Sequence, residues 1–243
     1  MKAIVMGATS GIGMEVAKLL AKNGWQVGIA GRRVDRLKDL KDAQKGIVCF
    51  QQIDITTTDA PVLLMQLIEE LGGMDMYFHS SGIGWQNTTL DIEKELKTME
   101  TNGTGFVRMV DTAFNWFAEK HGTKSPSRIA CITSIAGTKG LGAAPAYSAT
   151  KRFQTHYLEC LSQQARMHHL PIAITDIRPG FVKTDLIANS NYPLQLDAKD
   201  VARSIVNAIE HGKEVKVIDW RYALLVFFWR MIPRWVWTRM KIG

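Results

Sequence analysis

Short apolar runs alternate with longer amphipathic stretches along most of the chain, and this alternation limits the fold more than any other feature. Several runs are rich in Val and Ile and have no polar face, which is typical of strands covered on both sides. We expect strands at Ala3–Met6, Val27–Ala30, Ile47–Phe50, Met76–Phe78, Ile129–Ile132, Ile172–Ile177 and Val215–Ile218. We expect helices at Gly13–Lys22, Val34–Asp42, Pro61–Glu70, Ile92–Ala118, Tyr147–Met167 and Ala198–Ile209. The pattern predicts an α/β fold, a doubly wound sheet of seven parallel strands with helices on both faces.

No linker or internal repeat divides the 243 residues, so we expect one domain over residues 1–219, followed by a tail over residues 220–243. The net charge is +7, and the tail carries five basic residues and no acidic one, which leaves only +2 for the domain. A nearly neutral domain argues against a nucleic-acid-binding surface. The tail needs a separate explanation.

The three cysteines, Cys49, Cys131 and Cys160, lie far apart and lack the spacing of metal ligands, so we expect no metal site. Cysteine used as a small apolar side chain fits a reducing, cytoplasmic setting. A strand that starts at Ala3 leaves no room for a signal peptide, which is a further reason to expect a cytoplasmic protein.

The first expected strand runs into a glycine-rich turn, Gly7-Ala8-Thr9-Ser10-Gly11-Ile12-Gly13, which opens the first expected helix. Glycines allow a tight turn and a close approach of backbone N–H groups to phosphate, and the helix N-terminus favours negative charge. Inside a βαβ unit this pattern predicts a dinucleotide site of the Rossmann type.

Two arginines, Arg32 and Arg33, follow the second expected strand, where an NAD-specific site usually has an acid. Guanidinium groups pair with phosphate, and Ser10 adds a hydroxyl donor. The sequence therefore favours NADP(H) as the cofactor, with NAD(H) less favoured. The alternative is that the arginines form a solvated start to a helix.

Tyr147 and Lys151 are spaced so that they lie on one face of a helix, one turn apart. An ammonium group and a cationic nicotinamide would lower the pKa of the phenol from about 10, so that it could exchange a proton with a carbonyl or alcohol oxygen. Ser134 follows the strand before this helix, and its hydroxyl could hold the substrate oxygen. Asn102 lies among poor helix formers inside Ile92–Ala118, where a kink would free a backbone carbonyl to hold water near Lys151.

With the order and spacing of these motifs, and with Arg178-Pro179-Gly180-Phe181-Val182-Lys183-Thr184, residues 1–218 resemble the short-chain dehydrogenase/reductase family. The resemblance implies that Tyr147 is the acid/base, that Lys151 binds ribose and lowers the pKa of Tyr147, that Ser134 orients the substrate, and that Asn102 completes a proton relay. It implies that Asp54 contacts adenine and that Val182 and Thr184 hold the nicotinamide carboxamide. The cofactor set expected from motif and resemblance is Gly7, Thr9, Ser10, Gly11, Ile12, Gly13, Arg32, Arg33, Asp54, Ile55, Ser80, Ser81, Gly82, Tyr147, Lys151, Pro179, Gly180, Val182 and Thr184.

One motif departs from the family pattern. The family usually has Asn-Asn-Ala-Gly after the fourth strand, and this chain has His79-Ser80-Ser81-Gly82. The small residues still permit a close approach to a cofactor. We interpret His79 as a structural substitute rather than a catalytic group.

The segment from Asp185 to Leu196, which the resemblance places over the substrate, is mostly apolar and has no Lys or Arg to clamp an anion. We therefore expect NADP(H)-dependent hydride transfer to or from a carbonyl/alcohol pair, with an uncharged or lipophilic ketone or aldehyde as the substrate. The alternatives are a dinucleotide-binding sensor or scaffold, and a peripheral membrane protein acting through its tail. By resemblance, the chain is expected to form a homodimer or homotetramer.

The tail interleaves Trp, Phe and Arg, and its uncharged run Tyr222–Trp229 is too short to span a bilayer. Its composition suits an interfacial helix on anionic lipid, which would attach the protein peripherally to the inner face of a membrane. It also suits a subunit contact or a helix over the substrate mouth. The sequence leaves these two readings open.

Overall fold

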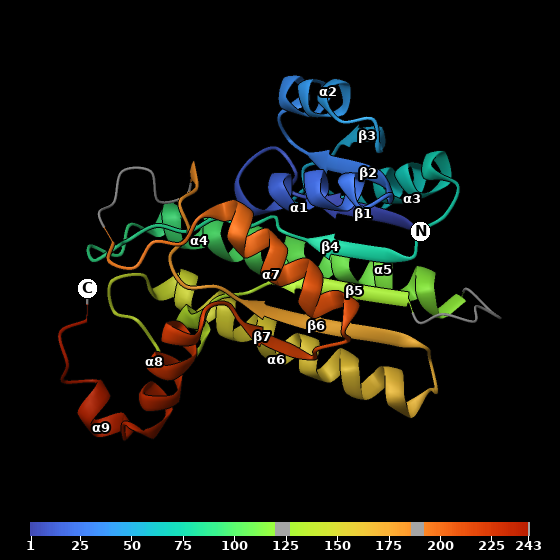
Figure 1. The fold of residues 1–243 in the computed structure, drawn as a ribbon. Coiled ribbons are helices and arrows are strands. Elements are labelled where there is room, and N and C mark those ends of the chain that lie inside the picture. The colour runs from blue at the N-terminus through green and yellow to red at the C-terminus, as the bar shows by residue number, and fades with distance from the viewer. Residues whose placement is uncertain (120–126, 186–191, 243) are drawn as a thin grey trace.

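Parallel strands form one sheet in the computed structural model, which describes residues 1–119, 127–185 and 192–242. The seven strands of the sheet are β1 (Lys2–Met6), β2 (Gln26–Gly31), β3 (Ile47–Gln52), β4 (Met76–His79), β5 (Ser127–Ile132), β6 (Ile172–Arg178) and β7 (Val215–Val217). Their order is β3-β2-β1-β4-β5-β6-β7, as Figure 1 shows. The direction of winding reverses between β1 and β4, and the crevice at the carboxyl ends of such strands is where doubly wound sheets bind ligands. The predicted fold class is confirmed.

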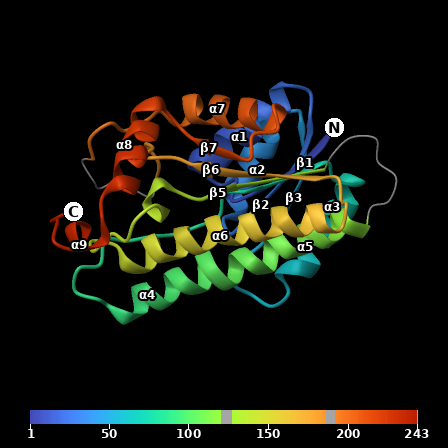
Figure 2. The same ribbon diagram turned by 90° about the horizontal axis from the view of Figure 1, so that it is seen from below.

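Helices cover both faces of the sheet (Figure 2). One layer contains α1 (Gly11–Lys22), α2 (Val34–Ala43) and α7 (Ala198–Glu210), and the other contains α3 (Ala60–Leu71), α5 (Phe106–Glu119) and α6 (Pro145–Met167). Each layer buries its apolar stripe against the Val and Ile side chains of the strands, which gives two cores, one on each face.

The long helix predicted over Ile92–Ala118 is interrupted where its sequence has poor helix formers. It consists of α4 (Ile92–Met99), a π-helical segment, η1 (Glu100–Gly105), and then α5. Gly105 lies against the chain at Ile55, because a Cβ there would be 3.0 Å from the Ile55 carbonyl oxygen. The wider π-helical turn confirms the predicted break around Asn102 and changes the pairing of the local backbone carbonyls.

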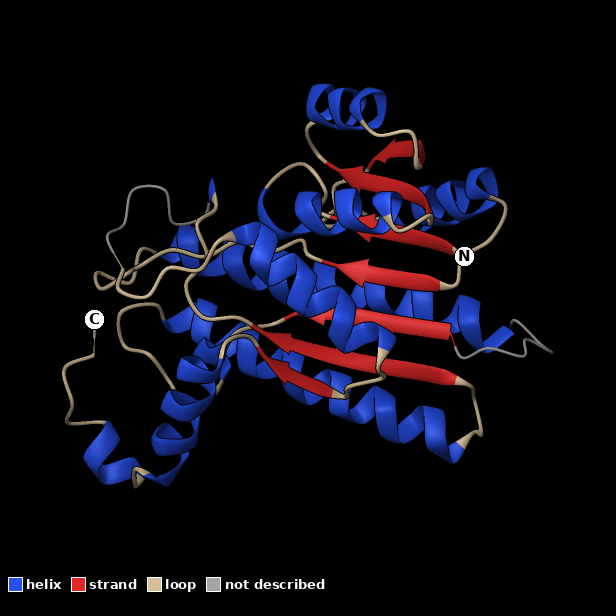
Figure 3. Ribbon diagram, in the orientation of Figure 1, coloured by secondary structure: helices blue, strands red, loops and turns tan. Residues whose placement is uncertain are grey.

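The tail forms α8 (Trp220–Met231) and α9 (Arg234–Trp237). Figure 3 shows the strand arrowheads pointing toward the end of the molecule where these two helices lie. Among the described residues, no helix is both long and apolar enough to cross a membrane.

Candidate active site

The glycine turn after β1 closes tightly on itself. Gly7 and Gly11 have φ of +89° and +56°, and a Cβ on Gly13 would lie 2.3 Å from the Gly7 carbonyl oxygen. Ser10 precedes α1 without capping it through its side chain, and the first turn of α1 contains no acid. The N–H groups at this helix end are therefore open to an anion, and the cradle fits a pyrophosphate.

A cluster of arginines lies over this turn. Arg33 Nη2 donates to Thr9 Oγ1 at 2.8 Å and to Ser10 Oγ at 2.7 Å. Asp185 Oδ2 accepts hydrogen bonds from Arg33 Nη1 at 3.2 Å and from Arg36 Nη1 at 3.0 Å. Arg36 was not identified from the sequence, although its position one helical turn after Arg33 is a signal that could have found it. Two guanidinium groups and two hydroxyls thus converge where a phosphate could bind.

Arg32 is not part of this cluster. Together with Asp54 it lines a cavity of about 1100 Å³ that runs along α4, η1 and the start of α6. Asp54 Oδ1 accepts hydrogen bonds from the backbone N and the hydroxyl of Thr56, at 3.0 and 2.8 Å. Burial by itself raises the pKa of Asp54, but the Thr56 hydrogen bonds and the charge of Arg32 outweigh it and lower the pKa. The next residue, Ile55, uses its carbonyl to accept from Arg108 Nη1 at 2.9 Å. An ionised Asp54 at the edge of the cavity is positioned to accept hydrogen bonds.

The Ser80–Gly82 turn after β4 lies directly against the glycine turn. Ser80 N donates to the Met6 carbonyl at 2.8 Å, and a Cβ on Gly7 would lie 2.7 Å from Ser81 N. A Cβ on Gly82 would lie 3.3 Å from Asn102 Oδ1. Small residues here let the turn after β4 lie close to both the glycine turn and Asn102.

His79 is fully buried beneath this turn, away from the crevice surface. Its Nδ1 lies 2.9 Å from the Tyr77 hydroxyl, and its ring packs edge-on against Phe106 with centroids 5.2 Å apart. Burial, followed by the charge of Lys151, lowers the pKa of His79 to about 3. Its Nε2 has no hydrogen-bond partner among the described residues. A neutral ring in the core supports the structural interpretation of His79.

Tyr147 lies in the first turn of α6, with Lys151 one turn further on. Burial raises the pKa of Tyr147, a side-chain hydrogen bond with Ser134 lowers it, and the nearby Tyr192 raises it, so that the net direction is upward. Lys151 Nζ lies 5.7 Å from the centre of the Tyr147 ring and is not among the groups that shift this pKa. The direction of this shift, set by protein groups alone, is opposite to the one that the resemblance implies.

Lys151 is 4% exposed, and its Nζ donates to the Ile132 carbonyl at 3.0 Å and to Gln154 Oε1 at 2.9 Å. Burial lowers the pKa of Lys151 to about 8, although Cys131 and Asp176 act in the opposite direction. The ammonium group is therefore held at the carboxyl end of β5 by two neutral acceptors.

Asn102 connects the π-helical segment to the turn after β4. Its Oδ1 accepts from Ile83 N at 2.9 Å, and its Nδ2 donates to the Ile83 carbonyl at 2.7 Å. The backbone carbonyl of Asn102, which was expected to hold a water molecule near Lys151, accepts a hydrogen bond from Gln154 Nε2 at 2.8 Å. Gln154 was missed by the sequence analysis; a polar residue three positions after Lys151, on the buried side of α6, is the signal that could have identified it.

Ser134 is the N-cap of a short 3₁₀ turn, η2 (Ile135–Gly137), where its Oγ accepts from Ala136 N at 3.1 Å. Beside it, Thr133 donates to the buried Asp176, which is paired with Arg178 at 2.7 Å. This network ties the ends of β5 and β6 together and fixes the backbone that carries Ser134. Nothing in the sequence indicates this network.

Known proteins resemble this chain over most of its length. The model of the family described as short chain dehydrogenase matches residues 1–194. The chain belongs to the short-chain dehydrogenase family. An uncharacterised oxidoreductase of Myxococcus xanthus is 29% identical over 239 residues, covering 95% of this chain and 92% of the relative. A mouse protein named dehydrogenase/reductase SDR family member 7B is 26% identical, covering 95% of this chain and 77% of the relative.

Solved structures show the same fold. A short-chain dehydrogenase from Sphingobium yanoikuyae in complex with NADPH has a TM-score of 0.81 at 17% identity, covering 100% of this chain and 97% of its own. A 3-oxoacyl-[acyl-carrier protein] reductase from Brucella melitensis in complex with NAD has a TM-score of 0.79 at 19% identity, covering 92% of this chain and 97% of its own. Structural neighbours in this family thus bind either dinucleotide.

In this family member the Pro179–Thr184 segment lies between the glycine turn and the tail. Pro179 O accepts from Ile135 N at 3.1 Å, and a Cβ on Gly11 would lie 2.9 Å from the Thr184 methyl group. On the other side, a Cβ on Gly180 would lie 2.3 Å from the Tyr222 ring of α8. Two hypotheses were left open for the tail, namely membrane association, and packing against a subunit or over the active site. The structure shows the tail packed against the Pro179–Thr184 segment of its own chain. Val182, the other residue of this segment in the cofactor set, forms a bridge with Leu196.

The substrate side of the crevice is aromatic. Tyr192 stacks on Phe181 with centroids 4.0 Å apart, and its hydroxyl accepts from Gln86 Nε2 at 2.9 Å. Gly84 leaves room for the ring of Tyr147, because a Cβ there would be 2.2 Å from that ring. Residues 186–191, the centre of the segment expected to cover the substrate, lie outside the described residues.

Proposed function

We propose that this protein is an NADP(H)-dependent oxidoreductase that reduces an uncharged or lipophilic ketone or aldehyde to an alcohol. The observation that carries the proposal is the position of the half-buried Tyr147, beside Ser134 and one helical turn from Lys151, next to an open dinucleotide cradle. This arrangement supplies a proton donor, an oxygen-binding hydroxyl and a cation at one point.

In the proposed reaction a bound nicotinamide supplies the hydride. Tyr147 donates its proton to the carbonyl oxygen, and its raised pKa keeps that proton in place until negative charge develops there. Ser134 holds the same oxygen by a hydrogen bond. Lys151 binds the ribose hydroxyls with its ammonium group. Gln154, which donates a hydrogen bond to the Asn102 carbonyl, accepts one from Lys151 Nζ and holds that ammonium group in position.

The preference for NADP(H) rests on the arginines. Arg33 and Arg36 converge with Thr9 and Ser10 beside the glycine turn, and Arg32 lies at the edge of the adjacent cavity. Guanidinium groups bind phosphate bidentately, whereas an NAD site needs an acid for the ribose hydroxyl. The 2′-phosphate of NADP(H) is the group that suits this cluster.

An apolar substrate fits the aromatic wall formed by Phe181 and Tyr192. Lys139, on the loop before α6, does not serve as an anion clamp, because its Nζ donates to the Ile232 carbonyl of the tail. We further propose a cytoplasmic homo-oligomer that assembles through α4 and α6, where Leu96, Met99 and Phe153 are exposed on one surface.

The experiment is to measure NADPH and NADH binding by cofactor fluorescence for the native chain and for Arg33→Ala, followed by turnover of a panel of ketones by the native chain and Tyr147→Phe. We expect NADPH to bind more tightly, Arg33→Ala to weaken NADPH selectively, and Tyr147→Phe to bind NADPH but lose activity by about 10²–10⁴-fold. Binding without turnover of any ketone by the native chain would instead support a dinucleotide sensor.

A further inference from the structure

The outer face of α8 is a continuous apolar surface. Apolar residues on this face recur every three or four positions, which places them on one side of the helix, and α9 contributes one further apolar residue. We call these exposed side chains the tail face: Trp220, Leu224, Phe227, Phe228, Met231 and Trp235. Trp220 is 73% exposed and Trp235 is 67% exposed. Exposed aromatic side chains gathered in this way are unusual on a monomer surface unless they bind something.

The opposite side of the tail is fixed to the protein's own active-site loops. Tyr222 and Val226 are buried against Ile135, and the Tyr222 hydroxyl accepts from Phe181 N at 3.2 Å and donates to the Leu194 carbonyl at 3.0 Å. Trp237 is also buried, and its Nε1 donates to the Gly140 carbonyl at 2.7 Å. The tail is therefore held in place without a partner, and its anchoring keeps the tail face turned outward.

Cations flank the tail face and no acid lies within it. Asp219, just before α8, is already paired with Arg221 at 2.9 Å. From Trp220 onward the sequence has five basic residues and no acidic one. Arg230 and Arg234 are exposed and form no ion pair with any described residue. The charge complementary to this surface is negative.

We propose that the tail face docks on an anionic lipid surface, with its aromatic and aliphatic side chains in the headgroup region and its arginines on lipid phosphates. A peripheral helix of this kind combines a large apolar face with Lys and Arg beside it, and Trp suits the interface because it has an apolar body and a polar edge. A second copy of the chain is a poorer occupant, because a two-fold contact would bring cations of both tails together with no acid between them.

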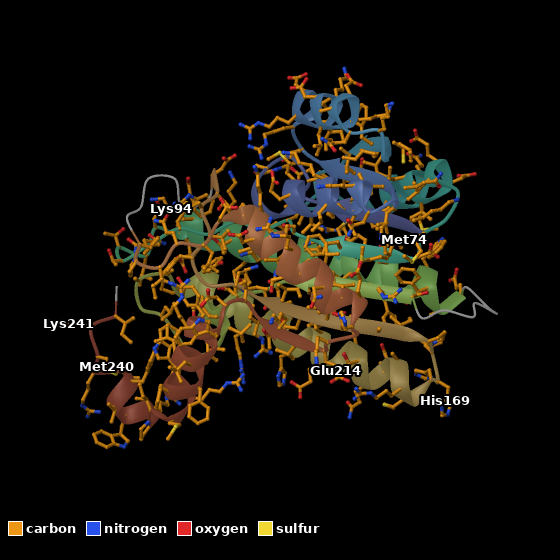
Figure 4. All side chains as sticks on the ribbon, in the orientation of Figure 1. Met74, Lys94, His169, Glu214, Met240 and Lys241 are labelled. Carbon is orange, nitrogen blue, oxygen red and sulfur yellow. The ribbon has the colours of Figure 1, made fainter. Side chains whose placement is uncertain are left out.

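Docking would orient the active site toward the lipid. Two further anchors join the tail to the loop that leads from Ser134 to Tyr147. Lys139 Nζ, on this loop, donates to the Ile232 carbonyl, and Trp237 Nε1 donates to the carbonyl of Gly140 on the same loop. Figure 4 places Met240 and Lys241 beyond α9 at this end of the molecule, with His169 near the opposite end. The docking does not depend on the proposed activity; its use, the delivery of a lipophilic carbonyl compound from the bilayer, rests on the proposed function.

The test is flotation of the full chain with vesicles of phosphatidylcholine alone and of phosphatidylcholine with phosphatidylglycerol, at low and high salt. We expect binding to the anionic vesicles that falls at least tenfold in high salt and at least tenfold in Trp220→Ser/Phe228→Ser/Trp235→Ser. Arg230→Glu/Arg234→Glu should reduce it similarly. The matched controls are Val62→Ser/Met65→Ser, which changes exposed apolar residues of α3, and Lys45→Glu/Lys213→Glu, which makes the same charge change elsewhere; both should bind as the native chain does.

Equal binding by the tail-face variants and the controls would overturn the proposal. So would a native chain that does not bind vesicles but forms an oligomer, measured by sedimentation, that the three serine substitutions dissociate. Turnover of a soluble ketone with NADPH, measured on the same variants, should be unchanged. A failure of the lipid proposal is thereby distinguished from a failure of the enzyme proposal.

Discussion

Gln154 donates a hydrogen bond from its side-chain Nε2 to the backbone carbonyl oxygen of Asn102 at 2.8 Å. Its Oε1 accepts from Lys151 Nζ at 2.9 Å. A carbonyl only accepts and an ammonium only donates, so one orientation of the amide satisfies both partners. The fully buried Gln154 is thus a positioning residue that links the π-helical segment to Lys151.

Replacing Gln154 tests this link. Gln154→Leu leaves two buried polar groups short of a partner, and we expect the free energy of unfolding to fall by about 1–3 kcal/mol and kcat to fall with it. Gln154→Glu places a carboxylate beside Lys151, which raises the pKa of Lys151 above about 8. In the proposed mechanism, loss of the ammonium charge sets the alkaline limit of activity. The fall in kcat/KM at high pH should therefore move to higher pH in the Glu variant.

The control is Gln163→Leu, at an exposed position on the same helix. It should leave both the stability and the pH profile unchanged. A Gln154→Glu variant that changes stability but keeps the native pH profile would show that the residue is merely structural.

The fold and the glycine turn could be predicted because both depend on patterns of residues that are close together in the sequence. The alternation of apolar runs gives the strands, and the position of Gly7–Gly13 between a strand and a helix gives the cradle. Tyr147 and Lys151 are one helical turn apart, so their proximity also follows from local geometry. The break at Asn102 follows from the poor helix formers around it.

The roles of Gln154, Asp176 and Tyr222 could not be predicted, because they depend on contacts between segments far apart in the chain. The position of Gln154 after Lys151 could have marked it as a neighbour of Lys151, but not as a partner of the Asn102 carbonyl. Gln154 resembles any polar residue of an amphipathic helix until the π-helical segment is brought against it. The burial of Tyr222 requires a glycine at position 180, and nothing near Tyr222 in the sequence indicates that. The pairing of Asp176 with Thr133 likewise depends on the register of β5 and β6.

Asp185 competes with phosphate for the arginine cluster. Its Oδ2 accepts from both Arg33 and Arg36, and those two bonds hold the pKa of Asp185 below its usual value. Exposed pairs of this kind contribute about 0.2–1 kcal/mol. We therefore expect Asp185→Asn to tighten NADPH binding about two- to fivefold, with little effect on NADH, because only NADPH carries the 2′-phosphate. Titration by cofactor fluorescence measures both.

Asp39→Asn, an exposed acid on α2, is the matched control for the change in net charge. It should leave the ratio of NADPH to NADH affinity close to that of the native chain. An equal gain for both cofactors in Asp185→Asn would mean that the carboxylate does not occupy the phosphate position.

The contact between Gly180 and Tyr222 makes the tail part of the fold. A Cβ at Gly180 would lie 2.3 Å from the Tyr222 ring, so Gly180→Ala must displace α8 and should cost about 1–3 kcal/mol. Tyr222→Ala empties the same space and should cost about 3–5 kcal/mol. The double variant should be more stable than the sum of the two losses predicts, as urea unfolding can measure. Gly142→Ala is the control and should leave the free energy of unfolding unchanged, because nothing lies within 4 Å of the added Cβ. Strictly additive losses in the Gly180→Ala/Tyr222→Ala double variant would refute the contact.

His79 should make the fold sensitive to acid. Burial, followed by the charge of Lys151, lowers its pKa to about 3 from 6.5, so between these values the unfolded chain takes up a proton that the folded chain does not. Stability is therefore lost as pH falls through this window, at a rate of up to about 1.4 kcal/mol per pH unit from this residue.

His79→Asn introduces the residue that the family pattern has here and should remove this component. The free energy of unfolding, measured with urea, should then differ less between pH 7 and pH 5 in the variant than in the native chain. His156→Asn, at an exposed position on α6, should retain the native pH dependence. The same acid sensitivity in His79→Asn as in the native chain would mean that other groups cause it.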